Sequence, residues 1–159
     1  MRKLIRRIIG ALTPTRRETV APFPMLNLED LEAHMKQMPG QVEIPVEHHF
    51  SPGLYLRSVT IPAGTLVMGK RHRGPACNIL MQGKLAIYTS EFEPPTIMEA
   101  PRIFTTSPHS KKFVYCIEEA VFVNVFPTEE TDPDRIEEQV IIPEREYLEL
   151  KKEAQKCLS

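Results

Sequence analysis

The densest group of side chains that could do chemistry is the tetrapeptide KRHR at residues 70–73. His72 could act as a general base, because the cations beside it favour the neutral form of an imidazole. No acidic residue stands nearby in the sequence to orient that ring. The cationic side chains could instead hold an anion such as a phosphate or a sugar acid. Three interpretations are therefore open: a general base, a ligand site formed by Lys70, His72 and Arg73, and a histidine without a chemical role.

The other candidate groups are poorly placed for catalysis. His48 and His49 are adjacent in an extended segment, where neighbouring side chains point to opposite faces and rarely share a metal ion. Glu118 and Glu119 stand between two apolar runs, where a hairpin turn is expected rather than two carboxylates across a cleft. The sequence contains neither a glycine-rich phosphate loop nor a nucleophile elbow. We therefore predict no catalytic residue and no enzyme activity.

The composition sets the size and setting of the domain that must position these groups. A chain of 159 residues is long enough for one domain with a core and additional arms. Its 15 prolines predict short strands and extended connections, because proline is excluded from helix interiors and central strands. The three cysteines have no metal-knuckle spacing, which favours a reduced compartment. No apolar run approaches the roughly 20 residues of a membrane-spanning helix, so no membrane partner is expected.

The N-terminal segment is strongly basic, with six bases and no acid in residues 1–17. Residues 2–12 show helical spacing of apolar residues and predict a short amphipathic helix that ends before Pro14. We expect this arm to dock on protein, either its own domain, a sister subunit or another partner; a membrane surface and nucleic acid are weaker alternatives. The residues expected to dock are Leu4, Ile5, Arg6, Arg7, Ile8 and Ile9.

A proline-rich link at residues 18–26 leads to a second predicted helix at residues 27–38. Asn27 resembles an N-cap, and Pro39 and Gly40 end the helical pattern. The apolar face of this helix is formed by Leu28, Leu31, Met35 and Met38. Residues 41–52 are expected to form another extended link.

The body of the chain is predicted to be β. Its expected strands are residues 53–61, 65–69, 77–82, 84–90, the stretch around 103–106, 113–118 and 120–126. Many short strands without interleaved helices predict a sandwich or a small barrel. The inward positions are expected to be apolar, near Ile79, Met81, Phe113 and Tyr115, which disfavours a polar pocket. A helical turn is expected at residues 133–139, and a C-terminal helix with Glu-to-Lys pairs at 144–157.

Two stretches carry a resemblance to a known family. IPAGTLVMGKRH with the closing Gly83, and later APRIFTTSPHSKKF, resemble the two motifs of the cupin superfamily. GLYLRSVTIPAGTLVMGK, the N-x-L-x-x-G pattern after it, and EEAVFVNVFPTEETDPDRIEEQVIIP resemble small cupin-like proteins encoded by bacteriophages. The resemblance covers about residues 50–143 and implies a jelly-roll barrel, often dimeric or larger.

The resemblance also implies where a metal site would lie. The resemblance implies a metal site whose ligands in cupins are three histidines and one carboxylate, spread over the two motifs. The matching positions in this sequence are Lys70, His72, Ala76 or Cys77, and Phe113. His72 alone keeps a metal-binding side chain, whereas a divalent ion needs about three protein ligands. We therefore expect no metal and no other cofactor.

These patterns lead to one principal hypothesis for organisation and function. Residues 1–49 would form the arm, link and short helix, residues 50–143 a cupin-like jelly-roll barrel, and residues 144–159 a C-terminal helix. The chain would be a non-enzymatic homo-oligomeric component of a bacteriophage virion, assembled in the host cytoplasm, in a decoration, collar or tail-associated position. Its partners would be other virion proteins held through the arm, with no membrane or nucleic acid. The alternative is a metal-independent cupin that binds or modifies a sugar or nucleotide sugar.

Overall fold

The computed structural model describes residues 6–8, 28–88 and 94–157. Within them the strands are β1 (Arg6–Ile8), β2 (Gln41–Glu43), β3 (Val46–Ser51), β4 (Leu54–Ile61), β5 (Leu66–Met68), β6 (Ala76–Tyr88), β7 (Thr96–Glu99), β8 (Arg102–Thr106) and β9 (Phe113–Pro127). The helices are α1 (Leu28–Gln37), α2 (Pro133–Val140) and α3 (Glu144–Lys156).

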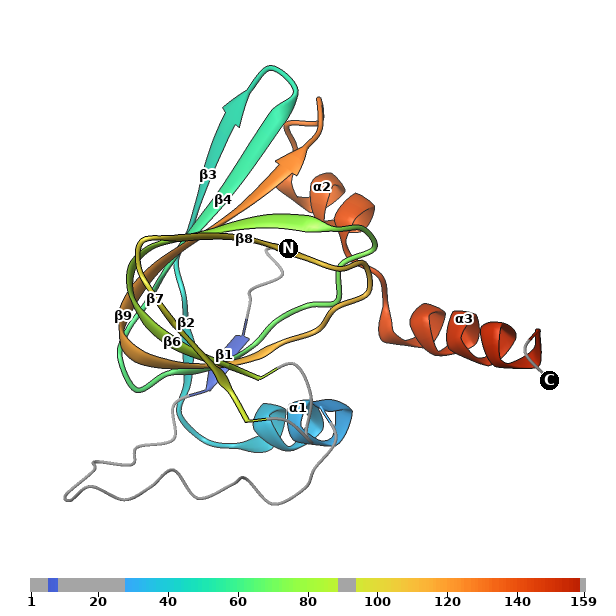
Figure 1. Ribbon diagram of the computed structural model, residues 1–159, viewed down its shortest axis with the longest axis horizontal. Helices are drawn as coiled ribbons and strands as arrows, with labels where there is room; N and C mark the ends of the chain where they lie inside the picture. The colour runs from blue at the N-terminus through green and yellow to red at the C-terminus, as the bar shows by residue number, and fades with distance from the viewer. Residues whose placement is uncertain (1–5, 9–27, 89–93, 158–159) are drawn as a thin grey trace.

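Two long strands, β6 and β9, form the centre of the fold. They pair antiparallel from Cys77 opposite Val125 to Tyr88 opposite Phe113. β9 also pairs with β4 and β5, and β6 also pairs with β7 and β8, so short strands flank the central pair. The strands curve around a common interior (Figure 1). The predicted mainly-β jelly-roll barrel with a C-terminal helix is confirmed.

The hairpin turn predicted at Glu118 and Glu119 is wrong, because both residues lie inside the continuous strand β9. The partner strand β6 has register shifts between Leu80 and Leu85, around Gly83. Gly83 has a φ of 87°, and a Cβ built on it would lie 2.1 Å from the carbonyl oxygen of Glu119. The acidic pair therefore marks an irregularity of the strand pair, where only glycine allows the close backbone approach.

The helix predicted across residues 2–12 is wrong for Arg6, Arg7 and Ile8, which form β1. β1 pairs antiparallel with β2 and contacts β5, so the barrel's own sheet supplies its backbone partners. Pairing with a sheet edge can override a helical spacing of apolar residues as short as this one. The rest of the predicted docking arm, including Leu4, Ile5 and Ile9, lies outside the described residues.

Residues 41–52 are extended as expected, but they are not a link. β2 pairs with β1, and β3 pairs with β4 along six residues, from Val46 opposite Val59 to Ser51 opposite Leu54. The sheet therefore begins before residue 50, the boundary that the sequence predicts for the barrel.

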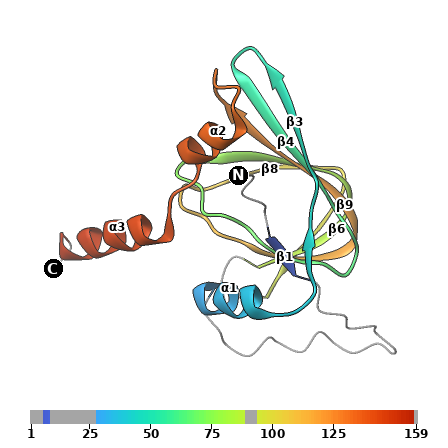
Figure 2. The same ribbon diagram turned by 180° about the vertical axis from the view of Figure 1, so that it is seen from behind.

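The three helices confirm the helical segments predicted at residues 27–38, 133–139 and 144–157. α1 packs Leu31 and Met35 against Phe113. α2 begins at Pro133 after the N-cap Asp132, and its Ile136 is buried against Tyr55 and Phe126. α3 has no buried residue and projects away from the barrel (Figure 2). Among the described helices, none has the length and apolar character needed to cross a membrane.

Candidate functional site

The barrel contains a partly open cavity of about 1040 Å³, whose lining extends to residues of α1 and α2. Part of its wall is apolar and comes from the largest core cluster: Val59, Ile61, Val67, Leu85, Ile87, Val114 and Phe122. The rest of its wall includes polar and charged side chains from the strands and their connections. The volume of the cavity is at the upper end of the size range of pockets that hold small organic molecules.

The inward positions differ by one residue from those that the sequence analysis expected on β6. Met81 is 60% exposed, and the residues of β6 that line the cavity are Asn78, Leu85 and Ile87. A shift of one residue exchanges the two faces of a strand, because side chains alternate with a period of two. Phe113 is buried, but it packs against α1 and is not among the residues that line the cavity.

A polar row crosses three neighbouring strands inside the cavity. Arg57 on β4 lies opposite Asn124 on β9, which lies opposite Asn78 on β6. The Nδ2 of Asn124 donates a hydrogen bond to Oδ1 of Asn78 at 2.7 Å, and Asn78 donates to the carbonyl oxygen of Ala76 at 3.1 Å. The Nη2 of Arg57 is buried and has no hydrogen-bond partner in the part of the chain that the structure describes. Arg57 therefore brings to the cavity a buried nitrogen that lacks an acceptor among the described residues.

A second cation, Lys112, enters the cavity from the connection between β8 and β9. Its Nζ lies 5.1 Å from the ring centroid of Phe104. Burial lowers the pKa of Lys112 to about 8, because a charged ammonium loses hydration there. The amine still carries its proton for most of the time at neutral pH.

His72 lines the same cavity, with its ring 5.5 Å from that of Phe126 in an edge-on arrangement. Burial lowers its pKa to about 4, and the charges of Lys112 and Arg57 add to the effect. The imidazole is therefore neutral at pH 7, as the sequence indicates. Burial is the main cause, and the charges that contribute come from Lys112 and Arg57 rather than from Lys70, Arg71 and Arg73.

The other predicted ligand residues bind acidic side chains. The Nζ of Lys70 lies 2.6 Å from Oε1 of Glu137 on α2, at the lining of the cavity. Arg73 forms two hydrogen bonds with Glu146 on α3, which raise the pKa of Arg73, and it does not line the cavity. The structure thus brings Lys70 and His72 to the cavity and directs Arg73 to α3.

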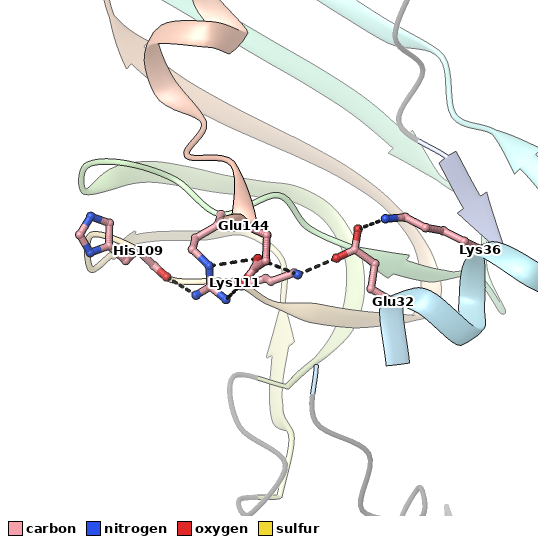
Figure 3. Close-up of polar contacts among 6 residues, drawn as sticks. Glu32, Lys36, His109, Lys111 and Glu144 are labelled. Carbon is pink, nitrogen blue, oxygen red and sulfur yellow. Dashed lines mark hydrogen bonds and ion pairs between the residues drawn. The ribbon is translucent and has the colours of Figure 1, made fainter. Parts of the chain in front are cut away.

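Four charged residues at the lining of the cavity form a group that we call the α1–α3 clamp: Glu32, Arg71, Lys111 and Glu144. The side chains of Lys111 and Arg71 are only 4% and 8% exposed. Lys111 Nζ lies 2.6 Å from Glu32 on α1 and 3.2 Å from Glu144 on α3 (Figure 3). The clamp therefore joins both helices to the connection between β8 and β9.

Arg71 completes the clamp from the other side of Glu144. Its Nη2 lies 3.1 Å from Oε1 of Glu144, and its Nη1 donates to the carbonyl oxygen of His109 at 2.7 Å. Its guanidinium also lies 3.7 Å from the ring centroid of Tyr147. Burial alone would raise the pKa of Glu144, but the hydrogen bond from Arg71 and the charge of Lys111 outweigh it, so that the pKa is lowered.

The donors around His72 do not fit a divalent metal ion. Lys70 binds Glu137, Phe113 packs on α1, and the charges nearest to His72 are cationic. Among the described residues there is no group of three or more His, Cys, Asp or Glu side chains that could hold a metal. The chemistry that this site supports is therefore binding by cations, amides and apolar walls.

A pH experiment tests the buried state of His72. An unfolded chain protonates this histidine below pH 6.5, whereas the folded chain does so only near pH 4. The free energy of unfolding should therefore fall as the pH drops from 6.5 towards 4, by about 1.5 kcal/mol between pH 7 and pH 5 after allowance for partial exposure. Chemical denaturation at both pH values should show a smaller fall in His72→Gln. The exposed His49→Gln should keep the fall of the wild type, and an equal fall in all three proteins would contradict the assignment.

The fold and the cavity together define a mainly-β jelly-roll barrel with a partly cationic interior. No protein-family model and no curated protein matches the sequence. The solved structures to which the chain is similar include proteins of the cupin superfamily. One is a cupin-like protein from Thermotoga maritima, with 14% identity and a TM-score of 0.46 over 66% of this chain and 82% of that chain.

Two further structures show a similar degree of likeness. An RmlC-like cupin family protein from Methanocaldococcus jannaschii has 13% identity and a TM-score of 0.45, over 58% of this chain and 84% of that chain. KdgF from a Halomonas species has 13% identity and a TM-score of 0.45, over 58% of this chain and 82% of that chain. At these identities and TM-scores the likeness carries no argument about activity or ligand.

Proposed function

We propose that the barrel binds a small organic molecule in its interior without a metal ion. The observation that supports this proposal is the cavity of about 1040 Å³, in which the polar row of Arg57, Asn78 and Asn124 lies next to an apolar part of the wall. Burying a polar group inside an apolar barrel costs free energy, unless the group forms hydrogen bonds with a ligand or within a network. A few converging polar groups in an apolar cavity are the usual composition of a small-molecule site.

The proposal corresponds to the metal-independent alternative of the sequence analysis, with the ligand described only as a small organic molecule. The role in a bacteriophage virion, the docking arm, the homo-oligomer and the sugar or nucleotide-sugar ligand stay predictions. The described part of the arm, β1, pairs within the barrel's own sheet, which weakens the argument for an arm free to reach another protein. The protein composition of purified particles would test the virion role.

The binding proposal is tested with N-phenyl-1-naphthylamine, an uncharged dye that becomes fluorescent in apolar surroundings. We expect a saturable increase in fluorescence with the wild type. Val114→Phe adds a ring to the wall of the cavity and should weaken binding at least tenfold, with folding checked by circular dichroism. Ile103→Ser removes an outer side chain that is 70% exposed and should leave binding unchanged. Loss of binding in Ile103→Ser but not in Val114→Phe would overturn the proposal.

A further inference from the structure

The charges that line the cavity are unevenly distributed. Three of its lining acids are held by cations: Glu32 and Glu144 by Lys111, and Glu137 by Lys70. The other lining acids, Glu43, Asp132 and Asp134, are exposed to solvent. Arg57 and Lys112 have no such carboxylate partner among the described contacts, although the charge of Glu137 reaches Arg57. The cavity therefore has two cations that face inward and no inward-facing acid that is unpaired.

The backbone of Arg57 is fixed by strand pairing on both sides, and its side chain lines the cavity. Its strand, β4, lies between β3 and β9, and Arg57 lies opposite His48 on one side and Asn124 on the other. A buried N–H group without an acceptor costs free energy, and a buried guanidinium N–H costs more. A carboxylate or phosphate oxygen is the acceptor that a guanidinium binds most strongly.

The same strands continue into an apolar half of the cavity. After Arg57, β4 presents Val59 and Ile61, and β9 presents Phe122 opposite Val59. Leu85 and Ile87 of β6 complete this part of the wall. A molecule whose charged group lay at Arg57 could therefore place an apolar body against these side chains.

We propose that the ligand is an organic anion, whose negative group binds Arg57 and Lys112 and whose apolar body packs on Val59, Phe122 and Leu85. This inference rests on the proposed function and adds the chemical class of the ligand. The proposal also gives Lys112 a role. Burial removes the hydration of its ammonium group, and a bound anion would compensate for that loss. A cation that destabilises the free protein and serves a ligand is the trade-off between stability and function seen at binding sites.

The stability of the free protein gives a first test of this role. Lys112→Met removes the ammonium that burial disfavours, while it keeps most of the apolar side chain. We expect the midpoint of thermal unfolding to rise in Lys112→Met without ligand. A fall in the midpoint would show that Lys112 is paired within the free protein, and it would overturn its part in the inference.

The main test compares two dyes with the same aromatic body. 8-Anilinonaphthalene-1-sulfonate carries one negative charge, and N-phenyl-1-naphthylamine carries none. We expect Arg57→Met and Lys112→Met each to weaken binding of the sulfonate at least tenfold and binding of the neutral dye less than twofold. Arg73→Met removes a cation that lies outside the cavity and should change neither.

The outcomes separate the two proposals. If the neutral dye binds inside the barrel but the sulfonate loses nothing in Arg57→Met and Lys112→Met, the cavity binds small molecules and the inference about anions is wrong. If neither dye binds the wild type saturably, or if Val114→Phe weakens neither, the proposed function itself fails. Should Arg57→Met not fold, Lys112→Met alone decides the inference.

Discussion

Gly83→Ala is expected to lower the free energy of unfolding by about 3 kcal/mol or more, because alanine disfavours a left-handed backbone and its Cβ would clash with β9. Gly83 has a φ of 87°, and its Cβ would lie 2.1 Å from Glu119 O and 2.7 Å from Ala120 Cα. Both contacts are with the backbone of β9, so no side chain can turn aside to relieve them. The expected result is a large drop in the midpoint of chemical denaturation.

Gly64→Ala is the matched control for this prediction. Gly64 also has a positive φ, of 77°, but no atom lies within 4 Å of its added Cβ. In the control, the free energy of unfolding should therefore fall by only about 1 kcal/mol, the cost of placing alanine in a left-handed backbone conformation. Equal losses in the two variants would show that β6 and β9 do not approach each other closely at Gly83.

Glu144→Gln is expected to be the most destabilising conservative change in the α1–α3 clamp. It removes the carboxylate that lies between the buried cations Lys111 and Arg71. Breaking a buried ion pair typically costs 3–5 kcal/mol, and we expect about 2 kcal/mol here, because Glu144 is partly exposed and Glu32 still binds Lys111. Chemical denaturation at pH 7 would measure the loss.

Two controls separate this loss from a general effect of charge. Glu146→Gln alters a pair with Arg73 that lies at the surface and should leave the stability unchanged. The pKa of Glu144 is lowered on folding, so its contribution is present above the ordinary pKa of about 4.5 and is lost as the pH falls below that value. The difference between the wild type and Glu144→Gln should therefore shrink in acid. A difference that is the same at pH 7 and pH 3 would contradict the clamp.

The strands and helices could be predicted from the sequence more completely than the site. Alternating or apolar runs locate β4, β6 and β9, and Pro133 and Glu144 begin the helices α2 and α3. The orientation of β6 could not be predicted, because both of its faces are apolar. Ile79 and Met81 satisfy the pattern of a buried face as well as Leu80 and Leu85 do.

Arg57, Asn78 and Asn124 have a signal in the sequence, since each is a polar residue within an apolar strand. These residues lie in one row because three strands pair side by side, and a local sequence pattern does not predict that pairing. Lys111 and Glu32 are 79 positions apart, so the clamp likewise depends on the fold. The sequence pattern predicts a cationic site at the KRHR tetrapeptide. In the structure, the inward-facing cations are Arg57 on β4 and Lys112 in the connection between β8 and β9.

The most direct test of an anion site inside the barrel is a crystal structure of the protein with bound 8-anilinonaphthalene-1-sulfonate. The structure should show the sulfonate within hydrogen-bonding distance of Arg57 Nη2 and near Lys112 Nζ, with the aromatic rings against Val59 and Phe122. A dye bound only on the outer face of the sheet, around Met81 and Ile103, with the interior left empty, would contradict an anion site inside the barrel.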